Sequence, residues 1–366
     1  MTNGKIRLAL VFGGQSAEHD VSLSSARSVM AAVDPARYEV LPIAITPGGE
    51  WLVGAPAVDL LASVGFDDAG VLPAMALMAH DHDVAGIAHA LSPAGPRGER
   101  GGPPIDVVFP LLHGPHGEDG TVQGLFELAG VPYVGAGVAG SAVGMDKILM
   151  KNLFMQAGLP VVPFMALTRA DWRREPEPIA ARVADTIGYP CFVKPANMGS
   201  SIGISRVDTP DGLPRALDAA ALYDRRLLVE RGVCAPRELE CGVLGNDEPA
   251  ASVVGEIRVR DAAFYDYDAK YQPGASDLVI PADVPHALAA RVRDAACRAF
   301  LTIDGAGMAR VDFLLGAGGD LYISEINTIP GFTPTSMFPL LWAASGLPYP
   351  ALIDRLVELA LERRHG

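Results

Sequence analysis

Apolar runs and amphipathic stretches alternate along the first third of the chain. An apolar run at residues 6–12 ends at a Gly-Gly pair, a helix is expected over residues 22–32, and a second apolar run follows at residues 38–45. This order of strand, helix and strand is typical of a parallel sheet covered by helices. Further strands are expected at residues 106–111 and 131–134, with a helix at 121–129. The first part of the chain is therefore predicted to be an α/β unit.

The pattern changes in the rest of the chain. Helices are expected at residues 145–156 and 170–187, and strands at 161–164, 191–195, 202–207 and 227–230, while the small residues of 128–145 indicate loops. Strands at 239–244 and 251–259 and a later hairpin then predict an antiparallel, α+β part. Because 366 residues exceed one typical core, we expect three domains, at residues 1–135, 136–232 and 233–366.

The hairpin at residues 309–333 is the stretch with the most concentrated chemistry. Strand alternation is expected to group Arg310, Asp312 and Leu314 on one face of the first arm, and Ile323, Glu325 and Asn327 on one face of the second. With a loop at 317–320, Asp312 lies opposite Glu325, and Arg310 opposite Asn327. Oxygen ligands of this kind suit Mg²⁺ or Mn²⁺ and not zinc. The alternative is a solvated hairpin whose acids are neutralised by Arg310 alone.

Composition narrows the classes of partner and compartment. The net charge of −14 argues against nucleic acid or an anionic membrane surface as the main partner. The apolar runs are too short, or too rich in proline and glycine, for a signal peptide or a membrane helix, so a cytoplasmic protein is expected. Only five of the 29 basic residues are lysines. A lysine inside a motif therefore hints that a compact point charge is needed there.

Two stretches in the middle of the chain suit a nucleotide. Residues 192–205 form a Gly/Ser loop between two strands, whose N–H groups could hold phosphate oxygens with the help of Lys194. No P-loop motif is present. Glu230, at the end of an apolar strand, suits an adenine amino group, and Glu238 suits ribose hydroxyls. The alternatives are a flexible hairpin tip and ordinary surface acids.

Two N-terminal loops and one later loop suit a small substrate. Glu18 follows the first strand, where α/β sheets bind ligands, and could pair with an ammonium group. His113 is a candidate donor to a carboxylate or an oxyanion, and Glu118-Asp119 is expected to start the next helix. Residues 264–276 have the composition of a lid. Helix capping and a plain surface loop are the alternatives. The GAGVAG match at 135–140 lacks a long strand before it and an acid after it, so we reject a dinucleotide fold.

Taken in order, the motifs of this chain resemble the ATP-grasp superfamily and, within it, the D-alanine–D-alanine ligases. The motifs are GGQSAEHDVS, HGPHGEDG, MDK, FVKPANMGSSIG, LVERG with RELE, YDYDAKY, RVDF and EINTIPGFTPTSMFP. The resemblance covers nearly the whole chain. It implies three α/β domains, with an N-terminal parallel one and with ATP bound between the central and C-terminal domains. Small departures are Asp20 where Glu is usual and Met198 in the glycine-rich loop.

The resemblance also implies a role for individual residues. The nucleotide would be held by Lys147, Lys194, Ser201, Glu230, Val233 and Glu238, and two Mg²⁺ (or Mn²⁺) ions by Asp312, Glu325 and Asn327. Glu18 would bind the ammonium of the first D-alanine and connect through Ser200 to Tyr271. The reacting carboxyl would be surrounded by His113, Arg310 and Gly331, and the second D-alanine by Lys270, Ser336 and Met337.

The implied activity is ATP-dependent joining of two D-alanines through an acyl phosphate, for peptidoglycan precursors. The family implies small-molecule partners, a homodimer and a possible monovalent cation. Tyr271 is typical of peptide-forming rather than ester-forming relatives. Two alternatives stay open: another ATP-grasp ligase of a carboxylate and an amine, and a nucleotide-binding module without catalysis.

Overall fold

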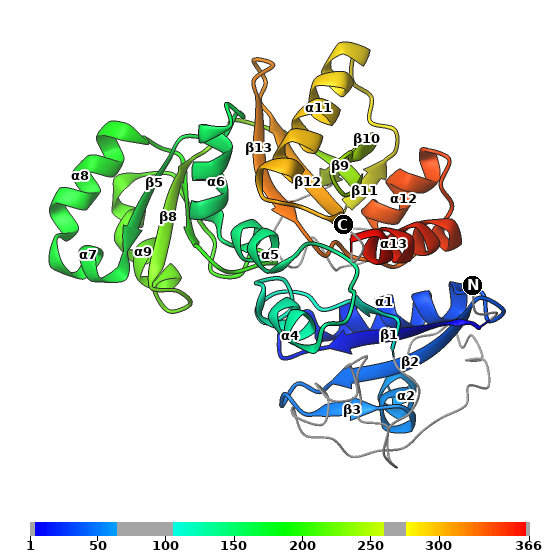
Figure 1. Cartoon of the computed structure of the whole chain (residues 1–366). Coiled ribbons are helices and arrows are strands. Elements are labelled where there is room, and N and C mark those ends of the chain that lie inside the picture. Colours follow the sequence, from blue (N-terminus) through cyan, green and yellow to red (C-terminus); the bar gives the residue numbers. More distant parts are fainter. Residues whose placement is uncertain (1–3, 64–104, 260–275, 364–366) are drawn as a thin grey trace.

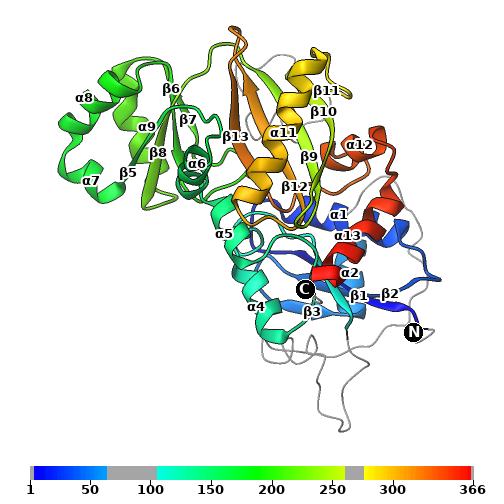
Figure 2. The ribbon, with the colours of Figure 1, turned by 45° about the horizontal axis from the view of Figure 1, so that its top comes forward.

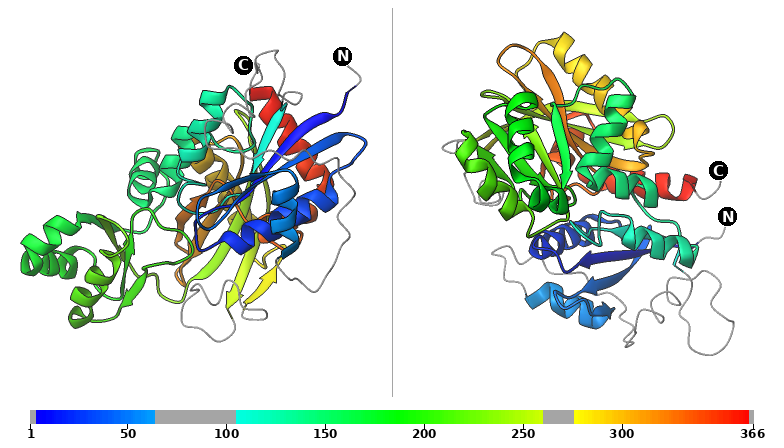
Figure 3. Two further views of the ribbon diagram at one scale, coloured as in Figure 1. Left: turned by 90° about the horizontal axis from the view of Figure 1, so that it is seen from below. Right: turned by 90° about the vertical axis from the view of Figure 1, so that its left-hand side faces the viewer.

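The structure is a computed structural model that describes residues 4–63, 105–259 and 276–363. Within these residues the strands form three sheets, each accompanied by helices (Figure 1). The second sheet and its helices project to one side of the other two sheets (Figure 3). The predicted mixed α/β class is confirmed.

The first sheet has the strand order β3-β2-β1-β4 and carries the N-terminal part of the chain. Its strands are β1 (Ile6–Gly13), β2 (Tyr38–Ile45), β3 (Trp51–Val53) and β4 (Val107–Pro110), and its helices are α1 (His19–Ala32), α2 (Ala55–Ser63) and α4 (Thr121–Ala129). β1 pairs in parallel with β2 and β4, as the sequence predicts. β3 adds an antiparallel edge. The strand predicted at residues 131–134 is reduced to a single bridge between Val108 and Tyr133.

The second sheet is antiparallel and has the order β5-β8-β6-β7. Its strands are β5 (Phe164–Thr168), β6 (Cys191–Pro195), β7 (Ser205–Val207) and β8 (Arg226–Arg231). The helices beside it are α7 (Arg169–Arg174), α8 (Pro176–Thr186) and α9 (Leu213–Ala220), with a 3₁₀ turn at Pro210–Gly212. The helix predicted at 170–187 is thus broken in two, because Pro176 cannot continue a helix and instead starts the next one.

Two helices lead from the first sheet to the second, namely α5 (Val138–Met145) and α6 (Lys147–Gln156). The prediction of loops over residues 128–145 is therefore wrong for α5. The helix predicted from residue 145 is interrupted at Asp146, whose carboxylate accepts hydrogen bonds from the backbone N–H groups of Ile148 and Leu149. Asp146 thereby caps α6. The same buried carboxylate is paired with Arg226 of β8, which fixes α6 against the second sheet.

The third sheet has the order β11-β10-β9-β12-β13. Its strands are β9 (Arg237–Gly245), β10 (Ala250–Val259), β11 (Ser276–Val279), β12 (Gly307–Leu315) and β13 (Leu321–Asn327). Its helices are α11 (His286–Thr302), α12 (Met337–Ala344) and α13 (Tyr349–Arg363). α11 lies across one face of this sheet (Figure 2). The predicted antiparallel order is confirmed.

The hairpin of β12 and β13 places Asp312 opposite Glu325 and Arg310 opposite Asn327, as predicted. The turn is nevertheless one residue longer than expected, because Leu315 pairs with Leu321. A β-bulge at Ser324 restores the register before the polar residues are reached. The same bulge corrects one prediction, because Ile323 pairs with Phe313 in the buried core and does not share the face of Glu325.

Helix α13 connects the C-terminal end of the chain to the first sheet. Its apolar residues, including Leu352 and Leu356, join one core cluster with residues of β1 and α1. At the surface, Tyr38 donates a hydrogen bond to Asp354 at 2.6 Å, and Arg37 contacts Glu358 at 2.8 Å. The first and third sheets are therefore held together by a shared core.

Candidate active site

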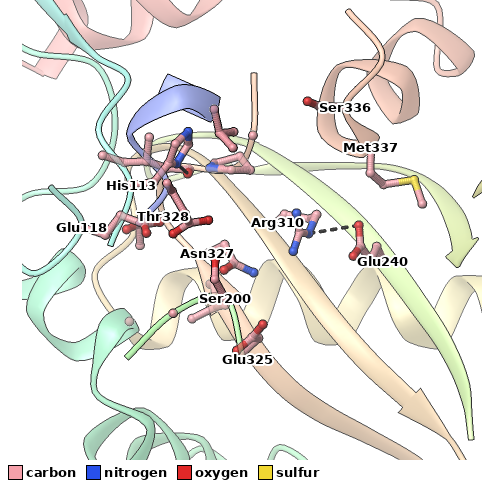
Figure 4. A pocket seen from close by; sticks show the side chains of 18 of the residues that line it. His113, Glu118, Ser200, Glu240, Arg310, Glu325, Asn327, Thr328, Ser336 and Met337 are labelled. Carbon is pink, nitrogen blue, oxygen red and sulfur yellow. Dashed lines mark hydrogen bonds and ion pairs between the residues drawn. The ribbon is translucent and has the colours of Figure 1, made fainter. Parts of the chain in front are cut away.

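A cavity of about 640 Å³ lies where the loops of all three sheets converge (Figure 4). It is enclosed by the loops after β1 and β4, by the Gly/Ser loop between β6 and β7, by the hairpin, and by the start of α12. The predicted site residues that line it are Glu18, His113, Lys147, Ser200, Arg310, Glu325, Asn327, Gly331, Ser336 and Met337. Side chains distant in sequence are thus brought together around one cavity.

The remaining predicted residues fall into two groups. Lys194, Ser201, Glu230, Val233, Glu238 and Asp312 are described but do not line this cavity. Lys270 and Tyr271 lie outside the described residues, and so does the lid predicted at 264–276 apart from its last residue. No statement about that lid follows from the structure.

The first polar group in the cavity is centred on Arg310. Its guanidinium donates two hydrogen bonds to Asp312, both at 2.7 Å, and lies 3.0 Å from Glu240 Oε2. Asn327 donates to the same Asp312 carboxylate at 3.0 Å. Burial lowers the pKa of Arg310, but Asp312 and Glu240 outweigh it and raise this pKa above its ordinary value. Figure 4 shows Arg310 with Asn327 on one side and Glu240 on the other, so a fixed positive charge is presented at the cavity wall.

The second polar group comes from the two N-terminal loops. Gly13 ends β1 at φ +90°, and a Cβ there would collide with the Ile45 carbonyl oxygen, so only glycine fits. The chain then turns toward Glu18. Ser22 secures this loop by accepting from the Gly13 N–H at 2.7 Å and donating to the Leu111 carbonyl. A Cβ on Gly114 or on Gly199 would lie within 3.7 Å of Glu18 Oε2, so the Glu18 carboxylate sits where the N-terminal and Gly/Ser loops meet.

His113 and Glu118 complete the second group. His113 Nδ1 lies 3.1 Å from the Ile329 carbonyl oxygen and must donate to it, because a carbonyl can only accept. Burial lowers the pKa of His113 and favours the neutral ring. Nε2 then carries a lone pair, so the predicted donor role of His113 would require a protonated ring. Glu118 accepts from the Gly114 N–H at 2.7 Å. Burial and then Glu18 raise the pKa of Glu118 to about 8.

The third polar group is a buried carboxylate between two lysines. Glu230 Oε1 lies 2.6 Å from Lys151 Nζ, and Oε2 lies 2.6 Å from Lys194 Nζ. Burial alone would raise the pKa of Glu230, but the two ammonium groups outweigh burial and hold it at about 2. Glu230 is therefore anionic at every physiological pH, and the cluster carries one net positive charge.

The Gly/Ser loop is held in an unusual backbone conformation beside the cavity. Ser200 and Ser201 have φ values of +50° and +59°, a left-handed region that side chains other than those of glycine seldom adopt. Lys147 Nζ donates to the Met198 carbonyl at 2.6 Å and attaches the loop to α6. Such strained backbone is concentrated at functional sites. Successive left-handed residues also point N–H groups into one concavity, which suits phosphate.

The hairpin residues were tested as a magnesium site by the chemistry of their donors. Within the described residues no three His, Cys, Asp or Glu side chains gather as a metal cage. Two carboxylates and one amide do converge through the register of Asp312, Glu325 and Asn327. All-oxygen donors fit Mg²⁺. Because Arg310 occupies both oxygens of Asp312, a metal ion would have to compete with that ion pair.

Comparisons with known families decide the relationship of the chain. A model of the D-ala D-ala ligase N-terminus matches residues 7–136, and a model of the D-ala D-ala ligase C-terminus matches residues 153–358. The chain belongs to the D-alanine–D-alanine ligase family. The resemblance stated from the sequence motifs is confirmed.

Curated members of the ligase family are similar over almost their whole length. A D-alanine–D-alanine ligase of Geobacillus kaustophilus is 50% identical over 362 residues, covering 98% of this chain and 95% of the relative. One of Listeria monocytogenes is 48% identical over 364 residues, covering 98% and 96%.

Solved structures of ligases are similar in fold. The D-alanine–D-alanine ligase of Coxiella burnetii has a TM-score of 0.79 at 34% identity, covering 99% of this chain and 95% of that chain. The VanG D-Ala:D-Ser ligase of Enterococcus faecalis has a TM-score of 0.82 at 32% identity, covering 98% and 100%.

Three residues of this ligase site were missed by the sequence analysis. Glu118 was assigned to the start of a helix, but α4 begins at Thr121 and the carboxyl of Glu118 lines the cavity. Glu240 has an alternating position on β9, next to the predicted Glu238, and alternation alone would have indicated the same face. Lys151 follows Lys147 by one helical turn, and that i,i+4 spacing was the available signal.

Proposed function

We propose that this chain joins two D-alanine molecules into D-alanyl-D-alanine, with conversion of ATP to ADP and phosphate through an acyl phosphate. The product would serve peptidoglycan precursor synthesis in the cytoplasm. One observation supports the proposal above others: the cavity joins the Glu18 carboxylate, the Arg310 guanidinium and the hairpin acids at the meeting point of three sheets. Within the described residues no helix is long and apolar enough to cross a membrane.

The proposed architecture is a three-domain ATP-grasp fold, with boundaries at residues 1–135, 136–232 and 233–366. Each interval contains one of the three sheets. ATP would lie between the second and third sheets, where Lys147, Lys194, Ser201, Glu230, Val233 and Glu238 would contact it. A homodimer and a monovalent-cation requirement are proposed from the family alone.

In the first step the carboxylate oxygen of one D-alanine attacks the γ-phosphorus, and ADP leaves. Glu18 would bind the ammonium group of this substrate, in the place where two loops meet. Arg310 and Lys194 would reduce the repulsion between the carboxylate and the γ-phosphate. Asp312, Glu325 and Asn327 would hold two Mg²⁺ ions, which neutralise charge on the phosphates.

In the second step the amine of another D-alanine attacks the acyl carbon, and phosphate leaves. The tetrahedral oxyanion requires preorganised donors, for which Arg310 and the Gly331 N–H are proposed. Ser336 would frame the second substrate. Its hydroxyl lies 2.7 Å from Thr333 Oγ1 and accepts from the Thr333 N–H at 3.1 Å, so its position at the start of α12 is fixed. Met337, Lys270 and Tyr271 would complete this subsite and its cover.

The experiment that tests the proposal is phosphate release with MgATP and single amino acids. We expect release with D-alanine, and little with L-alanine or D-lactate. Release that does not depend on D-alanine would overturn the proposal.

A second candidate is a ligase that takes D-serine as the second amino acid. It is favoured by the structural similarity to the D-Ala:D-Ser ligase of E. faecalis. A mixture of D-alanine and D-serine distinguishes the two, because the dipeptides differ by one oxygen atom in mass spectrometry. We expect D-alanyl-D-alanine to predominate.

A further inference from the structure

Three of the five lysines of the chain gather around one carboxylate. Lys147 and Lys151 project from the same face of α6, and Lys194 projects from β6. The carboxylate is Glu230, at the end of β8. In a chain that otherwise uses arginine for its positive charges, this concentration of lysines calls for a physical explanation. Lys147 and Lys194 have proposed contacts with phosphate, whereas Lys151 has no role so far.

Lys151 differs from Lys194 in what it can reach. The Lys151 side chain is 1% exposed, and that of Lys194 is 12% exposed. Both ammonium groups lie 2.6 Å from Glu230, one on each carboxylate oxygen. Among the described residues Glu230 is the one acidic group that Lys151 contacts within ion-pair distance. Lys151 is therefore enclosed and committed to Glu230, while Lys194 lies nearer to solvent.

The burial of Glu230 makes its two partners unequal in function. Glu230 is 3% exposed, and a buried carboxylate that loses its counter-ion is strongly destabilised. If Lys194 were the sole partner, its transfer to a phosphate would leave such a carboxylate behind. With Lys151 on the other oxygen, Glu230 stays neutralised whichever partner Lys194 takes.

We propose that Lys151 is a positioning residue: it holds the charge of Glu230 permanently, so that Lys194 can move from Glu230 to the phosphates of a bound nucleotide. This inference rests on the proposed binding of ATP by Lys194 and Glu230. It assigns to Lys151 an effect on phosphate binding without any contact to the nucleotide.

The first test compares MgATP with adenosine, using the full chain and the Lys151→Met variant. Methionine keeps much of the length of lysine but removes its charge. Lys194 is then retained by Glu230, so we expect the Kd of MgATP to rise about tenfold or more. The Kd of adenosine, which has no phosphates, is expected to change less than about twofold. An equal weakening of both ligands, as a purely structural role predicts, overturns the inference, and so does an unchanged Kd of MgATP.

The second test removes the carboxylate as well. In Lys151→Met/Glu230→Gln no charge retains Lys194, and the net charge equals that of the wild type. We expect this double variant to bind MgATP more tightly than Lys151→Met. No recovery overturns the inference. If Lys151→Met fails to fold, the double variant decides alone: a Kd within about tenfold of the wild-type value supports the inference, and a larger loss overturns it.

A parallel measurement separates this inference from the proposed function. Phosphate release by the wild-type protein with D-alanine and MgATP tests the function itself. A wild type that releases no phosphate overturns the proposed function. An active wild type whose Lys151→Met variant keeps its affinity for MgATP overturns only the role of Lys151.

Discussion

Glu118 is expected to make the stability of the ligand-free protein depend on pH between about 4.5 and 8. Burial and the neighbouring Glu18 raise the pKa of its carboxyl to about 8, from 4.5 in the unfolded chain. The folded state therefore binds this proton more tightly than the unfolded state does. The resulting stability is fully present below pH 4.5, and it is lost as the pH rises through 8.

The magnitude follows from the two pKa values. Each pH unit inside the window lowers the free energy of unfolding by about 1.4 kcal/mol. Between about pH 5.5 and about pH 7.5, the wild type should thus lose about 2.7 kcal/mol relative to Glu118→Gln. Glutamine keeps the acceptor for the Gly114 N–H but has no proton to lose, so this variant isolates the titration.

The assay is urea unfolding of both proteins without nucleotide and with EDTA. Comparing the two at the same pH cancels the contributions of all other groups. The control is Glu177→Gln, which changes an exposed residue in the first turn of α8 and should give the same difference from the wild type at every pH. The reasoning is refuted if the difference between wild type and Glu118→Gln is also constant, or if it grows toward low pH.

Three further predictions concern the hairpin and its sheet. Asp312→Ala and Glu325→Ala should abolish phosphate release in single turnover while thermal unfolding stays cooperative; a normal rate in either variant would remove the metal assignment. Glu240→Gln should weaken the hold on the guanidinium of the cavity and lower kcat about tenfold, with the KM of ATP unchanged; an unchanged kcat contradicts this. Gly307→Ala should cost about 1–3 kcal/mol, because φ is +70° and the new Cβ would lie 2.8 Å from a backbone nitrogen before α5. Gly319→Ala, at φ +87° with open space, is its matched control and should lower Tm less.

Local patterns were sufficient where a single periodicity determines the element. The predicted bounds of β2, β6 and α4 match the structure, because each has a clear apolar run or helical pattern between turn signals. The pairing of Asp312 with Glu325 was also predictable, since strands joined by a short turn must pair in sequence order. The residues of the candidate site on this hairpin were therefore visible from the sequence.

Features that depend on distant partners were not visible. Asp146 interrupts the predicted helix because its carboxylate caps α6 and pairs with Arg226, and neither role follows from neighbouring residues. Lys151 has its partner on another element, so its burial could not be inferred from helical spacing alone. Ser324 shows no bulge signal in the sequence, and the face of Ile323 was mispredicted for that reason.

The extra residue at Ser324 has a consequence for how this protein tolerates change. It lies between the tip of the ribbon and the acidic groups, so it can absorb a one-residue insertion or deletion at the tip before the shift reaches Glu325. Chains related to this one should therefore vary in tip length without loss of activity, provided that the irregularity itself appears or disappears in step. The tip is free to drift in evolution because the strand behind it carries its own correction.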